Sequence, residues 1–529
     1  MKYFHVILVF FLGSSSLVNS ANILGLMGIP SPSHHIWNSV LLRRLAELGH
    51  NVTVLSVDMP KPQEKLPPNL HYIHLEKGYS MYDSEFKFDI TSLIGIRPFD
   101  SIPMFYDAGW KTCLGLSRSK GMKQLLDYPD NFKFDLIFND YTLGPMLLGF
   151  LHKFKYPPLI GVSAYLNPPN TIDGMSSHNY PAYVPYHTTS FTGEMSFWQR
   201  FENTLLFMFD TAYRRLIYYP KIDSIMRPYF SKDMPTLAQL EKHTKLSMVN
   251  SHPVITYIEP VPPNIIEIGG MQVLDAKPLP QDFENFLNNS RKNKIVMVSF
   301  GTNMKSTDFK DDQIDVILNA MEGLPQYDFI WKFDVKYLKK QLPGNVFVRP
   351  FLPQSDLLAH PKIKAFVTHC GALSTHESIF RGVPMIGVPL YFEQHRNIQR
   401  SILSGIAVEL DFRTMTTIEL INAIKNVVES PQIAANIKRI SAEFRDRPIK
   451  PLDLAIWWTE YLLRNPNPVH LESPAAKLNI FQANSLDILF VLWTFLALFT
   501  WITVKVLLLI WRKLSPQSNI KRTSKLKTH

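Results

Sequence analysis

The chain has 529 residues, of which 46% are hydrophobic and 19% are charged. This balance excludes a disordered or fibrous chain, and the length allows two or three domains with sizeable cores. Lysine and arginine outnumber aspartate and glutamate by 55 to 45, an excess compatible with nucleic acid, a membrane surface or no specific partner. The two cysteines, Cys113 and Cys370, lie far apart, which excludes a disulfide scaffold and a cysteine-rich zinc module.

Residues 1–20 predict a secretory signal peptide. Lys2 precedes an apolar run over residues 4–12, and small residues follow, with Val18 and Ser20 in a pattern typical of cleavage. We therefore expect the chain to enter the secretory pathway. In that oxidising compartment the two distant cysteines are expected to stay free and buried.

Residues 486–511 predict a transmembrane helix, because residues 488–510 are almost wholly apolar. At ~1.5 Å per residue this run covers a hydrocarbon core of about 30 Å. The tail, residues 512–529, holds six lysines and arginines and no acid, so the positive-inside rule places it in the cytosol. The body is then lumenal, in a type I single-pass topology that disfavours a nucleic-acid partner. Lys525 and Lys527 resemble a dilysine retrieval signal, which favours the endoplasmic reticulum membrane.

The body predicts two doubly wound α/β domains, residues 21–258 and 291–450, joined by a proline-bearing linker at residues 259–290. Residues 451–485 predict an amphipathic helix that packs across both domains, followed by a juxtamembrane segment. Short apolar runs predict strands in the first domain at residues 23–27, 52–57, 71–75, 134–138 and 159–163. Others predict strands in the second domain at residues 295–300, 329–332, 346–349, 365–368 and 385–388.

Two segments of the first domain, residues 77–115 and 165–225, are aromatic and contain proline. We predict that they are irregular insertions that wall a pocket. Ligands of doubly wound folds bind beyond the carboxyl ends of the strands, so two facing domains predict a cleft with one ligand on each side.

The most informative stretch, residues 366–394, reads FVTHCGALSTHESIFRGVPMIGVPLYFEQ. His369 and Gly371 follow a strand where a helix begins, and free amides at a helix N-terminus suit a diphosphate. Ser374 adds a donor there. Glu377, one turn later, is placed to accept hydrogen bonds from ribose hydroxyls.

Glu393 and Gln394 follow the next strand and offer an acceptor and an amide suited to sugar hydroxyls. Each residue alone fits an ordinary polar loop. Together, their order and spacing resemble the signature of the UDP-glycosyltransferases of the family-1 type, and the resemblance extends over nearly the whole chain.

Two further motifs carry the resemblance. Residues 350–358, PFLPQSDLL, resemble the family's uracil-binding loop, which implies that Phe351 stacks on the base and Gln354 reads its edge. The family usually has tryptophan where Phe351 stands. Residues 299–303, SFGTN, resemble the loop after the first strand of the donor domain, which implies that Gly301 and Thr302 lie at the phosphates.

The resemblance also implies the fold and the donor. Vertebrate members often have asparagine where this chain has Leu373, and the sequence here resembles the arthropod branch, which mostly uses UDP-glucose. The implied fold is α/β, with two facing Rossmann-like domains of the GT-B type and a C-terminal transmembrane helix. UDP-glucuronic acid as the donor, and a non-catalytic membrane-anchored binding protein, remain as alternatives.

His34 and Asp140 are the candidate catalytic residues. His34 follows the first strand at the position of the family's catalytic histidine, and a side-chain pKa of about 6.5 suits a general base. His35 is the alternative, although the register favours His34. Asp140, at the end of another strand, matches the carboxylate that supports the histidine, whereas Asp135 is expected to be structural.

The resemblance implies an inverting transfer of a hexose from a UDP-sugar, the donor substrate, to a hydroxyl of a small lipophilic acceptor. The chain has no Asp-x-Asp pair, so we expect neither a metal site nor another cofactor. The aromatic insertions suit a flat or elongated acceptor, and the formation of homo-oligomers stays open. Asn51 and Asn288 are the candidate glycosylation sites.

Overall fold

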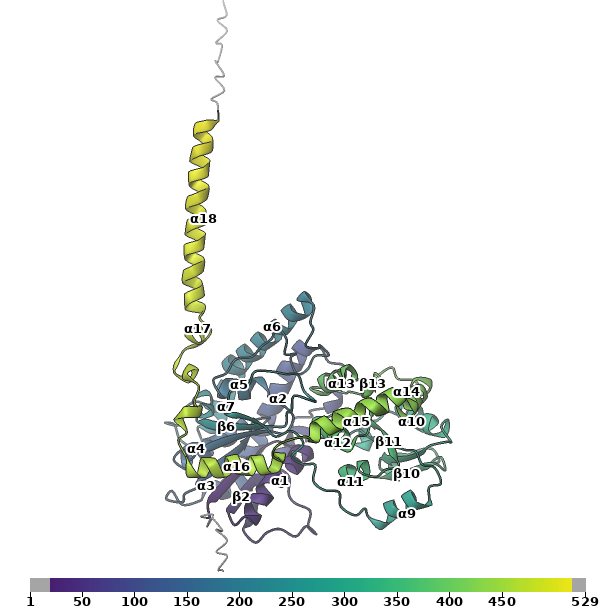
Figure 1. Cartoon of the computed structure of the whole chain (residues 1–529). Helices are drawn as coiled ribbons and strands as arrows, with labels where there is room; N and C mark the ends of the chain where they lie inside the picture. The colour runs from purple at the N-terminus through teal and green to yellow at the C-terminus, as the bar shows by residue number, and fades with distance from the viewer. Residues whose placement is uncertain (1–19, 516–529) are drawn as a thin grey trace, which may run out of the picture. The chain divides into compact units, whose positions relative to one another are not determined.

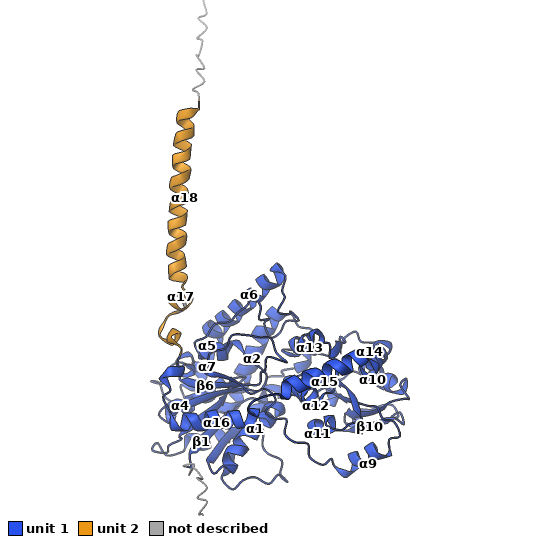
Figure 2. Ribbon diagram, viewed as in Figure 1, with its two compact units in different colours: residues 1–472 blue, residues 473–529 orange. Residues whose placement is uncertain are grey.

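The computed structural model describes residues 20–515. The signal peptide predicted over residues 1–20 and most of the tail predicted over residues 512–529, including its dilysine pattern, lie outside the described residues. The chain divides into two compact units, Met1–Glu472 and Ser473–His529 (Figure 2). The first unit contains two parallel sheets with helices around them (Figure 1).

The first sheet has seven strands in the order β3-β2-β1-β4-β5-β6-β7, all parallel to their neighbours. Its strands are β1 (Asn22–Met27), β2 (Asn51–Ser56), β3 (Leu70–His74), β4 (Leu136–Asp140), β5 (Leu159–Ser163), β6 (Thr244–Val249) and β7 (Ile265–Glu267). Alternate residues of β1 enter different core clusters: Leu24 and Leu26 pack with one, Ile23 with the other. Because successive side chains of a strand point to opposite faces, both faces of this sheet are buried.

The second sheet has six parallel strands in the order β10-β9-β8-β11-β12-β13. Its strands are β8 (Ile295–Ser299), β9 (Asp328–Lys332), β10 (Val346–Arg349), β11 (Ile363–Thr368), β12 (Met385–Gly387) and β13 (Ala407–Glu409). The two sheets confirm the predicted GT-B architecture of two Rossmann-like halves. The first strand of each half, β1 or β8, lies in the interior of its sheet. The loop that follows each of these strands therefore has the loops of two neighbouring strands beside it.

Helices of the first half connect its strands or form its insertions. They are α1 (Pro32–Glu47), α2 (Pro98–Ser117), α3 (Lys120–Leu126), α4 (Gly149–Lys153), α5 (Pro169–Gly174), α6 (Phe197–Tyr213), α7 (Tyr219–Met226) and α8 (Leu237–Glu241). The remaining helices are α9 (Gln281–Asn289), α10 (Asp311–Glu322), α11 (Gln354–Leu358), α12 (Ala372–Arg381), α13 (Gln394–Leu403), α14 (Thr417–Glu429), α15 (Pro431–Arg445), α16 (Pro451–Arg464), α17 (Ile480–Ala483) and α18 (Leu486–Leu514).

Three expectations about the organisation need correction. The insertions are not irregular, because α2, α6 and α7 occupy much of them. Pro98 lies at the start of α2, where a missing N–H costs nothing, but Pro103 lies inside α2. Pro220 follows the π-helical turn Arg214–Tyr218, which joins α6 to α7 in one continuous helical run. Strand β7 of the first sheet and helix α9 lie inside the segment predicted as a linker, residues 259–290.

The third correction concerns α16, which was expected to pack across both halves. Ala455 and Leu462 of α16 are buried in the core cluster that lines one face of the first sheet. The preceding helix, α15, buries Ile437 and Phe444 in a cluster of the second half. The chain therefore returns from the second half to the first between α15 and α16, and Phe444 of α15 also contacts His252 of the first half.

A segment of the first half is built into the core of the second. Residues 88–96, which we call the cleft strap, lie between β3 and α2. Leu93 of the strap is 1% exposed and belongs to the same core cluster as Phe300 and Phe412. Phe88 and Ile96 pack against this cluster as well. The two halves are thus joined by apolar burial at the cleft as well as by the connecting chain.

The second unit contains α18, which is long and apolar enough to cross a membrane. It covers the predicted span, residues 486–511, and continues to Leu514. Both cysteines are free and buried, as expected. The two candidate glycosylation sites, Asn51 and Asn288, are exposed. Asn51 is the first residue of β2, and its side chain lies at the surface.

Candidate functional site

A cavity of about 370 Å³ lies where the carboxyl ends of the two sheets face each other. Loops after β1, β4 and β5 line one side of it, and loops after β8, β11 and β12 line the other. The sequence-predicted residues that line it are His34, Gly301, Thr302, Phe351, Gln354, His369, Gly371, Ser374, Glu377, Glu393 and Gln394. Asp140 does not line the cavity, because its side chain is buried beneath His34.

His34 and Asp140 form a hydrogen-bonded pair at the first-half side of the cavity. His34 Nδ1 lies 3.0 Å from Asp140 Oδ2, and the two residues are 8% and 1% exposed. His34 lies in the first turn of α1 rather than in the loop before it, because Pro32 starts the helix early. With Nδ1–H donating to the carboxylate, Nε2 keeps its lone pair for a proton from another molecule.

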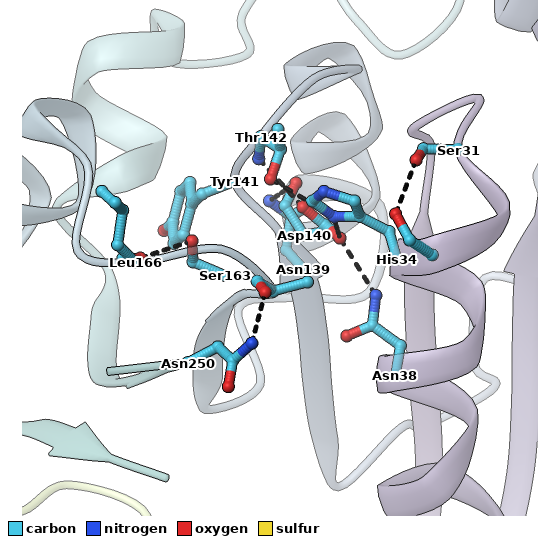
Figure 3. Close-up of polar contacts among 12 residues, drawn as sticks. Ser31, His34, Asn38, Asn139, Asp140, Tyr141, Thr142, Ser163, Leu166 and Asn250 are labelled. Carbon is cyan, nitrogen blue, oxygen red and sulfur yellow. Dashed lines mark hydrogen bonds and ion pairs between the residues drawn. The ribbon is translucent and has the colours of Figure 1, made fainter. Parts of the chain in front are cut away.

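Three residues, His34, Asn38 and Thr142, hold Asp140 (Figure 3). Asn38 Nδ2, one turn after His34 on α1, donates to Oδ2 at 3.0 Å, and the Thr142 amide donates to Oδ1 at 2.9 Å. Burial alone would raise the pKa of Asp140, but the charge and hydrogen bond of His34 and the bonds from Thr142 hold this pKa below its ordinary value. The carboxylate is therefore ionised and oriented toward the imidazole.

The two competing residues have other contacts. His35 points away from the cavity and its ring contacts that of Tyr72 at a centroid distance of 5.9 Å. Asp135 Oδ2 accepts a hydrogen bond from the Asn22 amide at 2.7 Å, across the start of β4 and β1. Of the two histidines, only His34 reaches the cavity, and Asp135 has the structural contact expected of it.

On the second-half side, His369 occupies a slot between two glycines. A Cβ atom at Gly301 or at Gly371 would overlap the His369 ring, and Gly301 also has a φ of +78°, which favours glycine. Burial, together with the nearby Lys332 ammonium, lowers the pKa of His369 to about 3. His369 is therefore a neutral imidazole at the cavity wall, between the loop after β8 and the start of α12.

Gln354 connects the predicted uracil loop to α12. Its Nε2 donates to Ser374 Oγ at 3.0 Å and to Glu377 Oε2 at 2.8 Å. Burial raises the pKa of Glu377 to about 7, although the Gln354 amide opposes this shift. Gln354, Ser374 and Glu377, all predicted to bind the UDP-sugar, therefore form one hydrogen-bonded group along the cavity wall.

The remaining predicted residues lie at the two ends of this wall. Gln394 Oε1 accepts from the amides of Leu390 at 2.8 Å and Tyr391 at 3.2 Å, so only its NH2 group is free to donate to a ligand. Burial raises the pKa of its neighbour, Glu393. At the other end, the Phe351 ring is 53% exposed, and Lys61 Nζ from the first half lies 3.9 Å from its centroid.

The comparisons with known proteins cover almost the entire chain. The profile of the family described as "UDP-glucoronosyl and UDP-glucosyl transferase" matches residues 27–521. The chain belongs to this family. It is 32% identical over 509 residues to UDP-glucosyltransferase 2 of Dactylopius coccus, covering 94% of this chain and 95% of the relative. It is 30% identical over 505 residues to UDP-glucuronosyltransferase 2B15 of Rattus norvegicus, covering 91% and 92%.

Solved structures agree with this family assignment at the level of the fold. A UDP-glucose:anthocyanidin 3-O-glucosyltransferase in complex with UDP aligns with a TM-score of 0.55 at 14% identity, covering 85% of this chain and the whole of that chain. The forosaminyltransferase SpnP aligns with the same TM-score at 17% identity. The family to which the chain belongs consists of UDP-glycosyltransferases that act on small acceptors, so this protein is an enzyme of that class.

For this UDP-glycosyltransferase, several residues in the cavity wall or directly behind it were not predicted from the sequence. Asn38 and Thr142 hold Asp140, and the i to i+4 spacing of His34 and Asn38 on α1 was the available signal. Lys332, at the end of β9, lines the cavity and donates to the Gly301 carbonyl. Tyr165 and His187 line the first-half side, and single residues of an insertion carry no spacing that reveals them.

The described residues contain no group of three or more histidine, cysteine, aspartate or glutamate side chains suited to a metal ion. At the cavity of this glycosyltransferase, the His34 imidazole on the first-half side stands opposite a second-half wall that carries both hydrogen-bond donors and the carboxyl groups of Glu377 and Glu393. Independence from metal ions stays a prediction of the sequence.

Proposed function

We propose that this enzyme transfers a hexose from a UDP-sugar to a hydroxyl group of a small lipophilic acceptor, with inversion at the anomeric carbon. The observation that carries the proposal is the His34–Asp140 hydrogen bond. His34 lines the same cavity as the second-half residues that are predicted to bind the UDP-sugar. His34 Nε2 removes the acceptor's proton as the oxygen attacks, and Asp140 stabilises the imidazolium that forms.

UDP leaves on the opposite side of the anomeric carbon. The amides at the start of α12, after Gly371, and the side chain of Thr302 stabilise the negative charge that develops on the diphosphate. His369, neutral and adjacent to both loops, donates a hydrogen bond there. Phe351 stacks on uracil, Gln354 binds its edge, and Glu377 accepts from the ribose hydroxyls. Glu393 and the free NH2 group of Gln394 bind the sugar hydroxyls.

We propose glucose as the sugar. Leu373 is apolar and is part of the resemblance to the arthropod branch, and a relative with 32% identity is named a UDP-glucosyltransferase. UDP-glucuronic acid is the second candidate, because relatives with about the same identity are named UDP-glucuronosyltransferases. A panel of UDP-sugars, with release of UDP as the readout, separates the two donors.

We further propose that the enzyme resides in the endoplasmic reticulum membrane with its body in the lumen. Helix α18 supports the anchor, and the basic residues after it support a cytosolic tail. A lipophilic acceptor dissolved in the membrane is then available to the tethered enzyme. Protease protection of the body in sealed microsomes, lost on addition of detergent, is the expected result.

The test of the catalytic assignment is His34→Ala, compared with His35→Ala as the matched control. His34→Ala should abolish transfer to hydroxyl acceptors and leave the affinity for UDP unchanged, as measured by calorimetry. His35→Ala should retain transfer. Normal turnover by His34→Ala would refute the assignment of the base.

A further inference from the structure

His187 stands in the first-half wall of the cavity with an unused hydrogen-bonding group. It belongs to the insertion between β5 and α6, and its ring lies against that of Tyr186 at a centroid distance of 4.3 Å. Its Nδ1 atom is sealed from solvent and has no hydrogen-bond partner within the described part of the chain. Nε2 is therefore the nitrogen through which this ring can bind a ligand in the cavity that it lines.

The ring is neutral. Burial, together with the guanidinium of Arg396, lowers the pKa of His187 to about 3. A neutral imidazole has one N–H and one lone pair, and a buried N–H without an acceptor is rarer in folded proteins than a buried lone pair. We therefore assign the proton to Nε2, which makes the side chain a hydrogen-bond donor toward the cavity.

Tyr165 links this donor to the catalytic pair. Its ring centroid lies 6.3 Å from that of His34 and 6.4 Å from that of His187. The two imidazoles therefore border the same aromatic stretch of the cavity, with one tyrosine ring in contact with both. A flat molecule that places a hydroxyl at His34 extends along this stretch toward His187.

A small recess lies behind the same residues. It has a volume of about 30 Å³, and Phe105, Thr142, Tyr165 and His187 line both the recess and the main cavity. That volume is enough for water, and Asp210 and Arg214, whose Oδ2 and Nε atoms form an ion pair at 3.7 Å, also line the recess. The wall around His187 is therefore polar on one side and aromatic on the other.

We propose that His187 selects acceptors that carry a second oxygen atom, of a carbonyl, ether or hydroxyl group, remote from the hydroxyl that is glycosylated. This inference rests on the proposed function, since it places the attacked hydroxyl at His34. The acceptor class is a neutral, flat molecule with an oxygen at each end. A donor that faces the cavity, such as the Nε2–H of His187, favours a ligand that supplies an acceptor over one that does not.

The test uses two pairs of phenols with the full-length chain in detergent. The one-ring pair is para-hydroxyacetophenone and para-ethylphenol, and the two-ring pair is the para-hydroxybiphenyl with a distal acetyl or ethyl group. Within each pair only the remote carbonyl differs in hydrogen bonding. Affinity in the presence of UDP is measured by calorimetry, and kcat/KM by release of UDP from the UDP-sugar. Differences in phenol acidity cancel when the acetyl-to-ethyl ratio is compared between variants.

His187→Phe keeps a flat ring and removes the donor, His187→Gln keeps a donor, and His470→Phe makes the same change at an exposed position. For the one-ring pair, the two-ring pair or both, the acetyl-to-ethyl ratio of affinities and of kcat/KM should be about tenfold lower in His187→Phe than in the wild type. It should be partly retained in His187→Gln and unchanged in His470→Phe. Affinity for UDP reports that each variant is folded.

An acetyl-to-ethyl ratio that is the same in the wild type and in His187→Phe for both the one-ring and the two-ring pair would overturn the proposal. A ratio lost equally in His187→Phe and His187→Gln, with UDP affinity intact, would also count against a donor role. Because binding does not require turnover, carbonyl-dependent binding without transfer would support the role of His187 and contradict the proposed function instead.

Discussion

Asn38 donates a hydrogen bond to Asp140 Oδ2, the same carboxylate oxygen that His34 Nδ1 contacts, and both distances are 3.0 Å. His34 and Asn38 are one turn apart on α1, so a single helix presents both partners to the carboxylate. Removing Asn38 would leave the buried oxygen with one partner fewer and would loosen the orientation of the pair. The position of Asn38 therefore predicts a positioning role.

Asn38→Ala should lower kcat by about tenfold, because a hydrogen bond to a charged buried group is lost. The affinity for UDP should be unchanged, since Asn38 does not line the cavity. The measurement is kcat and KM for one acceptor, with calorimetry for UDP. Ser39→Ala on the same helix is the control. An unchanged kcat in Asn38→Ala would show that the other contacts suffice to orient Asp140.

Asp140→Asn should reduce kcat by about 10³-fold or more, because an amide neither orients the imidazole correctly nor stabilises imidazolium. The same change should affect stability in a pH-dependent way. The pKa of Asp140 is lower in the folded state, so the ionised carboxylate stabilises the fold above its ordinary pKa, and this contribution is lost as the pH falls through the lowered value.

Thermal unfolding of the wild type and Asp140→Asn across this acidic range gives the measurement. The destabilisation by Asp140→Asn should be largest at neutral pH and should shrink toward low pH. A constant difference across the range would contradict the lowered pKa.

Glu377→Gln should show the opposite pH dependence. Burial raises the pKa of Glu377 from 4.5 to about 7, so the folded state binds the extra proton between these values and wild-type stability falls as the pH rises through them. At about pH 8 the variant should be more stable than the wild type by on the order of 3 kcal/mol, and near pH 4 the difference should vanish.

The same variant should bind UDP more weakly, because an amide is a poorer acceptor for ribose hydroxyls than a carboxylate. Thermal unfolding at several pH values and calorimetry with UDP, and with uracil as the control ligand, test both parts. Weaker binding of uracil as well as of UDP would argue that the Gln354 contact, rather than the ribose contact, was lost.

Gly301→Ala should abolish the binding of UDP or weaken it by more than tenfold. The added Cβ would overlap the His369 ring, and the φ of +78° costs about 1–2 kcal/mol for a residue other than glycine. Gly344→Ala is the matched control, because a Cβ there meets no atom within 4 Å. Wild-type UDP affinity in Gly301→Ala would show that the loop after β8 can move without harm to the donor site.

Glu393→Gln should alter sugar discrimination more than nucleotide binding. The ratio of kcat/KM for UDP-glucose over UDP-galactose should change by about tenfold, since one carboxylate contact to a sugar hydroxyl is lost. The affinity for UDP should stay at the wild-type value, as should both quantities in Glu322→Gln at the surface. Equal losses in the sugar ratio and in UDP binding would contradict the assignment.

The sequence was sufficient to predict the two-sheet architecture and most of the residues in the second-half wall of the cavity. Parallel strands that are buried on both faces are visible as continuous apolar runs, and the loops after them must meet at one edge of the sheet. This is why His34 and His369, far apart in the chain, could be placed at one cleft. Strands β7 and β13 were missed because they have only three residues each. Strand β6 was missed because Lys245 and Ser247 interrupt its apolar residues.

The acceptor side was predicted least well. The insertion that contains His187 was expected to be irregular, yet α6 follows it with a capping box formed by Ser196 and Gln199. That Ser-x-x-Gln pattern was a local signal for a helix start that the high aromatic content obscured. The contact of Tyr165 with both His34 and His187 depends on tertiary packing alone, so no pattern within one segment reveals it.

The cleft strap limits how freely the two halves can be exchanged. Leu93, encoded in the first half, is buried among side chains of the second half such as Phe300 and Phe412. In a chimera that combines the first half of this chain with the second half of a relative, the relative's residues beneath the cleft strap must therefore fit the strap, in addition to the linker. A change in the cleft strap that alters the cavity also alters the core of the second half, because the strap contributes to both.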